Sequence, residues 1–236
     1  MSWQREAKIK EDVFKMRKLK LFLTLLVILF CSGCRIIGVL GIPTRHEQRI
    51  PAEYDLSGAK DKKVLVLVEQ PTWLGAEVNL RYQITNAVIA NFMSDIRFRQ
   101  EQFVSYDELL NYRQRKVNFS LLSPVEIGEA LNADIVLHVM LGRYEVTKLA
   151  DSKYYNGLLD LRAVLYDVAS AKKLWPSEGK SKVVKVGLDA ESRGSEVVNG
   201  RLVKASSHCI VRYLYNCPKD RFKIAGDRSE VDWEKW

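Results

Sequence analysis

The chain has 236 residues, of which 47% are hydrophobic and 28% are charged, and its formal net charge is +8. This length suits one or two domains. Half of the net positive charge lies in the first 33 residues. The remainder shows no basic stripe interleaved with aromatic residues, so the composition argues against nucleic-acid binding.

Residues 16–34 have the order of a signal peptide. Residues 16–20 (MRKLK) form a basic head, residues 21–30 (LFLTLLVILF) are apolar apart from one threonine, and residues 31–34 (CSGC) are small. The apolar run is shorter than the about 20 residues that cross a bilayer. We therefore interpret residues 1–33 as an export signal peptide. Met16 could be the true initiator, in which case residues 1–15 are not translated.

The end of this segment resembles a lipobox, the signal that bacterial lipoprotein processing enzymes recognise. Ser32, Gly33 and Cys34 match that pattern, whereas Cys31 stands where leucine is commonest. The resemblance implies cleavage before Cys34, a diacylglyceryl thioether on its sulfur and acylation of the new amino group. Two or three acyl chains hold a protein stably on a membrane, whereas one does not. An uncleaved N-terminal anchor and an ordinary signal peptide cut elsewhere are the alternatives.

The remaining chain divides into three parts. Residues 34–62 are expected to be a lipidated tether, because Pro43, Pro51 and Gly58 punctuate a polar stretch. A globular α/β domain is expected over residues 63–217. Residues 218–236 are expected to be a charged C-terminal tail that ends in Trp233 and Trp236.

Hydrophobic periodicity predicts the elements of the globular domain. The continuous aliphatic runs at 63–69 and 134–141 are typical of strands buried on both faces. Ser123, Pro124 and Glu126 form a capping box with proline at the first helical position, which predicts a helix to about residue 131. The other predicted helices are 76–96, 106–112 and 195–215, and the other predicted strands are 103–105, 117–120, 158–168, 173–175 and 182–188.

Helices separate the early strands, whereas the late strands are joined by short turns. This order predicts an α+β fold, a mixed-sheet α/β sandwich with helices packed on a central sheet, in a single domain after the tether.

Two cysteines remain once residues 31 and 34 are explained. An exported pair such as Cys209 and Cys217 could form a disulfide. On one continuous helix they would lie about 12 Å apart along the axis, too far for a bridge, so the helix would have to end before Cys217, as Pro218 permits. Free buried thiols are the alternative.

No pattern in the chain indicates catalysis, and we predict no catalytic residue, metal ligand or cofactor. The three histidines, at positions 46, 138 and 208, lack metal-ligand spacing. His138 is interpreted as a core or sheet-face residue with no carboxylate beside it. Asp160 and Asp167 fall on opposite faces of one predicted strand, which disfavours a shared acid–base pair.

Loop residues offer the candidates for partner contact. Trp73 and Leu74 follow the first predicted strand, and Tyr154 and Tyr155 precede the strand at 158–168. Apolar loop residues can mark a partner surface, although they can equally cap the core.

Three segments resemble the CsgG-like α/β class of periplasmic lipoproteins, which includes curli-secretion lipoproteins and lipoprotein activators of penicillin-binding proteins. The segments are 130–137 (ALNADIVL), 161–168 (LRAVLYDV) and 172–175 (KKLW), and residues 169–172 lack the glycine that the family often has in that turn. The resemblance implies an α/β fold and a non-enzymatic accessory or assembly role in the envelope.

The sequence therefore predicts a lipid-anchored, non-catalytic envelope protein that faces the periplasm and binds an unidentified protein partner. By analogy with well-studied bacterial envelopes, the absence of an aspartate after Cys34 permits sorting to the outer membrane, which is the expected location. No nucleic acid or small-molecule substrate is indicated. The alternatives are a subunit of an oligomeric lipoprotein secretion channel and an unrecognised envelope hydrolase, the latter testable at His138, Asp160 and Glu178.

Overall fold

The computed structural model describes residues 48–74, 79–150 and 152–230. The signal peptide, Cys34, Trp233 and Trp236 lie outside these residues. The chain divides after Gln48, and the second unit, Arg49–Trp236, contains every element described below.

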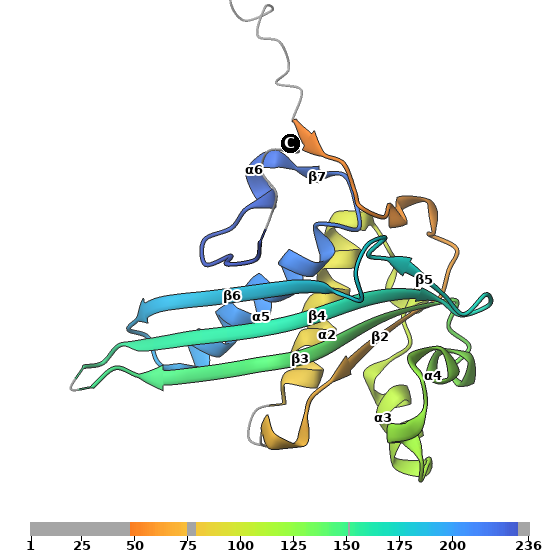
Figure 1. The fold of residues 1–236 in the computed structure, drawn as a ribbon, viewed down its shortest axis with the longest axis horizontal. Helices are drawn as coiled ribbons and strands as arrows, with labels where there is room; N and C mark the ends of the chain where they lie inside the picture. The colour runs from red at the N-terminus through yellow and green to blue at the C-terminus, as the bar shows by residue number, and fades with distance from the viewer. Residues whose placement is uncertain (1–47, 75–78, 151, 231–236) are drawn as a thin grey trace, which may run out of the picture. The chain divides into compact units, whose positions relative to one another are not determined.

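Figure 1 shows the strands and helices and labels most of them. They are β1 (Arg49–Ile50), β2 (Val64–Glu69), α2 (Leu80–Asn91), α3 (Tyr106–Arg115), α4 (Pro124–Ala130), β3 (Ile135–Lys148), β4 (Tyr155–Asp167), β5 (Lys172–Trp175), β6 (Lys182–Glu191), α5 (Ser195–Val211), β7 (Cys217–Pro218) and α6 (Lys219–Phe222). Short turns of helix include η2 (Thr72–Leu74), η3 (Phe92–Ile96) and η5 (Phe119–Leu121).

The main sheet is five-stranded and mixed. Its order is β2-β3-β4-β5, and β6 also pairs with β4. β2 runs parallel to β3, whereas the pairs β3–β4, β4–β5 and β4–β6 are antiparallel. Helices cover both faces, so the chain has the predicted α+β fold.

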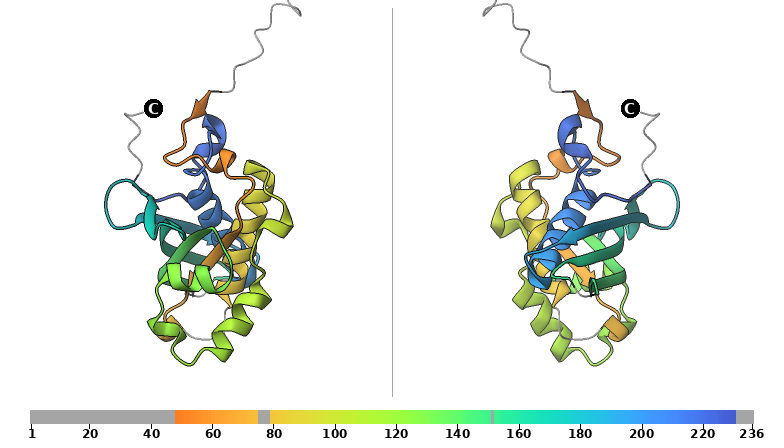
Figure 2. Two further views of the ribbon diagram at one scale, coloured as in Figure 1. Left: turned by 90° about the vertical axis from the view of Figure 1, so that its right-hand side faces the viewer. Right: turned by 90° about the vertical axis from the view of Figure 1, so that its left-hand side faces the viewer.

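β2 contributes to a hydrophobic cluster on each face of the sheet. Val64, Val66 and Val68 pack on one face with α2 and α5. Leu65 and Leu67 pack on the other face with α3 and α4. The two helical layers are visible in Figure 2. Because alternate residues of a strand point to opposite faces, a strand covered on both sides needs the continuous aliphatic run that predicted β2.

Several predicted elements are present with the local chemistry expected of them. Ser123 accepts a hydrogen bond from the Glu126 backbone N–H (3.2 Å), and Glu126 accepts one from the Ser123 N–H (2.7 Å), which begins α4 at Pro124. In the turn between β4 and β5, which lacks glycine, Ala171 takes the left-handed conformation (φ 53°).

Other predicted elements differ from the structure. The strand expected at 117–120 is wrong: residues 117 and 118 form a turn that leads into η5, and Val117 is 97% exposed. The helix expected over 76–96 begins at Leu80, where Asn79 caps it, and becomes a π turn at Phe92. Both strands of the β3–β4 hairpin are longer than predicted. β3 continues past residue 141 to Lys148, and β4 begins at Tyr155 rather than at residue 158.

The expected tether ends earlier than predicted. Residues 49–58 lie against the globular unit, because β1 pairs with β7 and the side chains of Ile50 and Leu56 are buried in the core. The Trp175 indole also donates a hydrogen bond to the Glu53 carboxylate (2.7 Å). These residues are therefore part of the fold.

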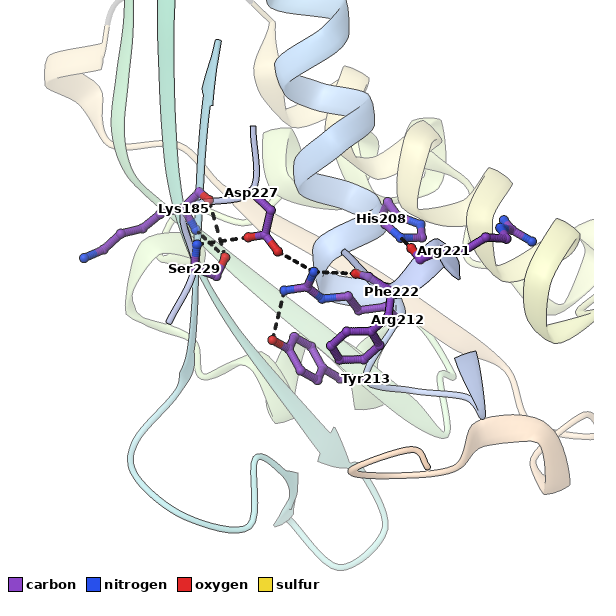
Figure 3. A network of polar contacts seen from close by, with 8 residues as sticks. All are labelled: Lys185, His208, Arg212, Tyr213, Arg221, Phe222, Asp227 and Ser229. Atoms are coloured by element: carbon purple, nitrogen blue, oxygen red, sulfur yellow. Dashed lines mark hydrogen bonds and ion pairs between the residues drawn. The ribbon is translucent and has the colours of Figure 1, made fainter. Parts of the chain in front are cut away.

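The C-terminal segment also packs on the globular unit as far as it is described. The Gly187 N–H donates to the Gly226 carbonyl (2.8 Å), and the Arg228 N–H donates to the Lys185 carbonyl (2.9 Å), so this segment runs along β6. Arg212, the C-cap residue of α5, is fully buried and pairs with Asp227 (Figure 3). Residues 218–230, expected to be a tail, thus complete the core beside α5.

Candidate partner-binding site

A pocket of about 530 Å³ opens at the carboxyl end of β2. It lies between the η2 turn and the connection from α3 to α4, which are at the same end of the unit in Figure 2. We call it the β2-end pocket. Its lining residues are Glu69, Gln70, Pro71, Thr72, Arg81, Arg113, Lys116, Val117, Phe119, Ser120, Met140 and Leu141. The carboxyl end of a parallel strand is where ligands commonly bind in open α/β sheets.

Glu69 in this pocket is paired with a histidine that the sequence analysis left without a carboxylate neighbour. His138 Nε2 lies 3.1 Å from Glu69 Oε2. Parallel pairing of Leu67 with His138 brings the two side chains to the same part of the sheet. The interpretation of His138 as a residue without a carboxylate partner is therefore wrong, because that partner comes from a strand distant in the sequence.

The environment favours the ionised form of Glu69. The His138 ring beside it lowers the pKa of this carboxyl, and Arg113 and Arg81 lower it further, against the opposing effect of burial. The Glu69 side chain is 47% exposed, whereas His138 is 7% exposed. Glu69 thus presents a carboxylate to the pocket.

Two arginines hold fixed positions around this carboxylate. Arg81 Nη2 donates to the Gln70 carbonyl (3.1 Å), and the Arg113 guanidinium stacks over the Phe119 ring at 4.6 Å. The Nε atoms of both arginines are buried and have no hydrogen-bond partner among the described residues. Burial lowers the pKa of Arg113, and the neighbouring Arg81 lowers it further. The fold thus holds two neighbouring guanidinium groups, each with an Nε–H donor that lacks a hydrogen-bond partner among the described residues.

The pocket carries more positive than negative charge. Its lining includes Arg81, Arg113 and Lys116 against the single carboxylate of Glu69. A partly buried excess of cations favours an anionic group. Guanidinium groups that line a pocket are suited to pairing with a carboxylate from a partner.

Three exposed apolar side chains belong to the segments that line this pocket: Val117 is itself a lining residue, and Trp73 and Leu121 follow the lining residues Thr72 and Ser120 in the chain. Trp73 of η2 is 67% exposed, Leu121 of η5 is 80% exposed, and Val117 is 97% exposed. We call these three residues the apolar rim. Exposed apolar groups can mark interaction sites, and tryptophan and arginine are enriched among residues that dominate binding energy.

The predicted partner contacts separate into two places. Trp73 belongs to the apolar rim, and Leu74 beside it packs against the core. Tyr154 is 41% exposed at the end of the β3–β4 hairpin, and Tyr155 begins β4 and packs against the core. Neither tyrosine lines the β2-end pocket.

The arginines of the pocket were not predicted from the sequence. Arg81 follows a helix cap and Arg113 lies near the end of a helix, so both have the spacing of ordinary solvent-exposed charges. No local signal distinguishes them, because their proximity depends on how α2 and α3 pack against opposite faces of β2.

The two remaining cysteines are free and buried in this structure, so the disulfide considered between them is not formed. Cys209 lies within α5 and Cys217 within β7. Burial raises the pKa of the Cys209 thiol to about 12, and the Cys217 thiol donates to the Tyr215 hydroxyl (3.2 Å). Neither sulfur has the lowered pKa of a reactive thiolate.

The other residues considered for chemistry do not gather at the pocket. Asp160 lies in the middle of β4, and Glu178 lies on the exposed turn after β5. Within residues 48–230, as far as the structure describes them, no group of three or more His, Cys, Asp and Glu could hold a metal ion. None of the described helices has the length and apolar content that a membrane span requires.

Comparison with known proteins identifies no family. No family model matches the chain, and no curated protein matches its sequence. Among solved structures, lipoprotein GNA1162 from Neisseria meningitidis is 18% identical, with a TM-score of 0.40 over 61% of this chain and 94% of that one. A PelC dodecamer from Paraburkholderia phytofirmans is 14% identical, with a TM-score of 0.37 over 70% of this chain and 92% of that one.

The LpoB C-terminal domain from Salmonella enterica is also 14% identical, with a TM-score of 0.30 over 59% of this chain and 85% of that one. The similar structures thus include a bacterial lipoprotein. The more specific CsgG-like class is not confirmed, and similarities at these TM-scores assign neither a family nor a function.

Proposed function

We propose that this chain is a lipid-anchored, non-catalytic protein of the cell envelope that binds a partner protein through the β2-end pocket and its apolar rim. Lipid on Cys34, implied by residues 31–34, would hold the folded unit on the periplasmic side of the outer membrane. The sequence from the basic head to the small residues supports this anchor.

One observation carries the binding role: exposed Val117 lines a pocket together with Arg81 and Arg113. Exposed Trp73 and Leu121 are next in the chain to its lining residues Thr72 and Ser120. An acidic side chain of a partner could pair with Arg113 while apolar neighbours cover the rim. Burying the rim would gain hydrophobic free energy, and the charges would select the partner and its orientation.

Site-specific photocrosslinking in intact cells tests this proposal. A photoreactive amino acid replaces Trp73 in one strain and Tyr154 in another, since both side chains are exposed aromatics in different places. We expect a discrete crosslinked protein from position 73, and we expect Arg113→Glu to abolish it. Crosslinks from position 154 alone, or a position-73 crosslink that survives Arg113→Glu, would assign binding to another surface.

Two further experiments distinguish the alternative functions. A hydrolase that uses His138 would lose its phenotype in His138→Gln, whereas a binding protein would keep the position-73 crosslink. Size analysis of the detergent-extracted protein tests the channel, because a large closed oligomer would favour it and a monomer would exclude it.

A further inference from the structure

A groove of about 800 Å³ lies between the second half of β3 and the beginnings of α2 and α5. Residues 144–147 of β3, the start of α2 and the first turns of α5 contribute to its lining, and we call it the α2–α5 groove. Figure 1 shows β3 extending past the end of β2 in this part of the sheet. The groove shares no lining residue with the β2-end pocket, and its volume suits a small-molecule ligand.

The lining holds polar side chains in fixed positions and leaves some of their groups available. Asn199 Nδ2 donates to Gln83 Oε1 (2.6 Å), which joins α5 to α2 at the groove. The Gln83 Nε2 group and the Ser195 hydroxyl make no hydrogen bond to another described residue, and neither residue is buried. An amide group and a hydroxyl placed in this way can donate hydrogen bonds to a ligand that carries hydroxyl groups.

The charges of the lining disfavour an acidic ligand. The lining contains no lysine, arginine or histidine, and its acidic residues are Glu145 and Glu196. Arg143 donates two hydrogen bonds to the Glu145 carboxylate (2.8 Å each), so this charge is compensated within β3. Glu196 makes no such pair among the described residues, and its carboxylate can accept hydrogen bonds from hydroxyl groups. Apart from that one carboxylate, the groups available to a ligand are neutral.

The groove also has an apolar part. Tyr144 and Val146 line it and pack against the core, so they are held in place from below. An aromatic ring beside hydrogen-bonding groups suits a ligand with one apolar face and a polar rim. A sugar ring has this form, because its C–H groups gather on a face and its hydroxyl groups project from the edge.

Gly200 keeps the groove open on the side of α5. It lies in the interior of this helix, where glycine is less favourable than alanine. A Cβ atom at this position would meet nothing within 4 Å, so no packing contact of the fold requires the glycine. Because Gly200 lines the groove, a larger side chain there would take up part of its space. The missing side chain thus lowers helix propensity and leaves room for a ligand.

From the lining of the α2–α5 groove and the open position of Gly200, we propose that this groove binds a neutral saccharide. The Gln83 amide, the Ser195 hydroxyl and the Glu196 carboxylate would bond to hydroxyl groups of the ligand, and Tyr144 would contact the apolar face of a ring. The inference does not depend on the function proposed for the β2-end pocket.

Binding of oligosaccharides to the full chain, extracted in a detergent without a sugar headgroup, tests the inference. The probes are an array of short neutral, acidic and amino oligosaccharides, together with N-acetyl-trialanine amide as an uncharged peptide. The affinity of the most strongly bound neutral sugar is then measured by isothermal titration calorimetry for the natural chain and its variants.

We expect neutral oligosaccharides to bind in preference to the other probes. Gly200→Leu should weaken this binding at least about tenfold by filling the groove, and Ser195→Ala should weaken it about three- to tenfold through loss of a hydrogen bond. Glu196→Gln keeps a hydrogen-bonding group and should change the affinity by less than about twofold. Lys204→Leu, on the exposed side of α5 outside the groove, is the matched control and should bind as the natural chain does.

Thermal unfolding separates a role in binding from a role in folding. Gly200→Ala should raise the midpoint of unfolding, because alanine favours the helix and its Cβ has free space. A lower midpoint would show that the fold itself requires the glycine.

The binding results can overturn the inference in three ways. Absence of binding to every neutral sugar would exclude the site, and unchanged affinity in Gly200→Leu would place the sugar elsewhere on the chain. Preference for amino sugars, lost in Glu196→Gln, would assign the groove to a cationic ligand, and preference for the uncharged peptide would assign it to a protein segment.

Discussion

Arg212 and Asp227 form an ion pair in which both side chains are almost fully buried, at 0% and 1% exposure. Arg212 also donates to the Phe222 carbonyl (2.6 Å) and the Tyr213 hydroxyl (3.0 Å). Figure 3 shows how these contacts join α5 to the C-terminal segment, which then bonds to β6 through Ser229. The segment is thereby attached by buried charge as well as by apolar packing.

Breaking this pair should destabilise the fold strongly. Arg212→Met leaves the Asp227 carboxylate buried without its cation, and we expect the free energy of unfolding to fall by about 3–5 kcal/mol. Chemical denaturation followed by circular dichroism measures the change. The double variant Arg212→Met/Asp227→Leu should recover much of the loss, and Arg228→Ala, which removes an exposed pair with Asp189, should have little effect. If Arg212→Met lowered the free energy of unfolding as little as Arg228→Ala does, the buried pair would not hold the C-terminal segment in place.

His208 should make stability depend on pH. Its Nε2 lies 2.7 Å from the Arg221 carbonyl. Burial lowers the pKa of this ring from its ordinary value of 6.5, and the Arg212 and Arg221 charges lower it further. Because the unfolded chain binds the proton more readily, this contribution to stability is present above pH 6.5 and is lost as the pH falls below it.

The variant His208→Gln isolates that contribution, because glutamine can still donate to the carbonyl but does not titrate. Unfolding free energies at a series of pH values between about 5 and 8 should fall less steeply for the variant, by up to about 1.4 kcal/mol per pH unit below the ordinary histidine pKa. Parallel curves for the two proteins would show that His208 is protonated equally in both states.

Gly157 permits close packing between β4 and α5. A Cβ atom at this position would lie 2.5 Å from Val198 Cγ1 and 2.8 Å from Leu202 Cδ1. We expect Gly157→Ala to lower the free energy of unfolding by about 1–3 kcal/mol through overpacking. Gly58→Ala is the matched control, because nothing lies within 4 Å of its Cβ position. Adding Val198→Ala to Gly157→Ala should restore part of the loss, whereas a further full-sized loss would argue against a direct clash.

Arg113 should contribute to binding at the expense of stability. Its pKa is lowered by burial and by Arg81, so the folded state bears a cost for its charge. In Arg113→Met the apolar contact with Phe119 remains, and we expect the free energy of unfolding to stay the same or to rise by up to about 1 kcal/mol. The partner crosslink from position 73 should be lost in the same variant. Marked destabilisation would make Arg113 a structural residue instead.

The sequence predicted those elements whose determinants are local. β2 and the first part of β3 were identifiable from unbroken aliphatic runs, and α4 from the reciprocal bonds of Ser123 and Glu126. The stretch from Val117 to Ser120 was misassigned because alternating apolar residues resemble a strand even when they form an exposed turn. The boundaries at residues 62 and 218 were misplaced because Leu56 and Phe222 lie in segments with many polar residues and no clear periodicity, yet both are buried.

Little of the candidate site could be predicted from the sequence. Trp73 was recognisable as a loop aromatic, but the pairing of Glu69 with His138 requires the register of two parallel strands. The positions of Arg81 and Arg113 require the packing of two helices on opposite faces of β2. Such relationships between distant parts of the chain leave no periodic signal in the sequence.

Mass spectrometry of the protein purified from its native membrane tests the central claim most directly. The account predicts that the N-terminal peptide begins at Cys34 and carries the mass of a diacylglyceryl group and a further acyl chain. Recovery of an unmodified chain that still begins at Met1 or Met16 would contradict the anchor, and with it the proposed role in the envelope.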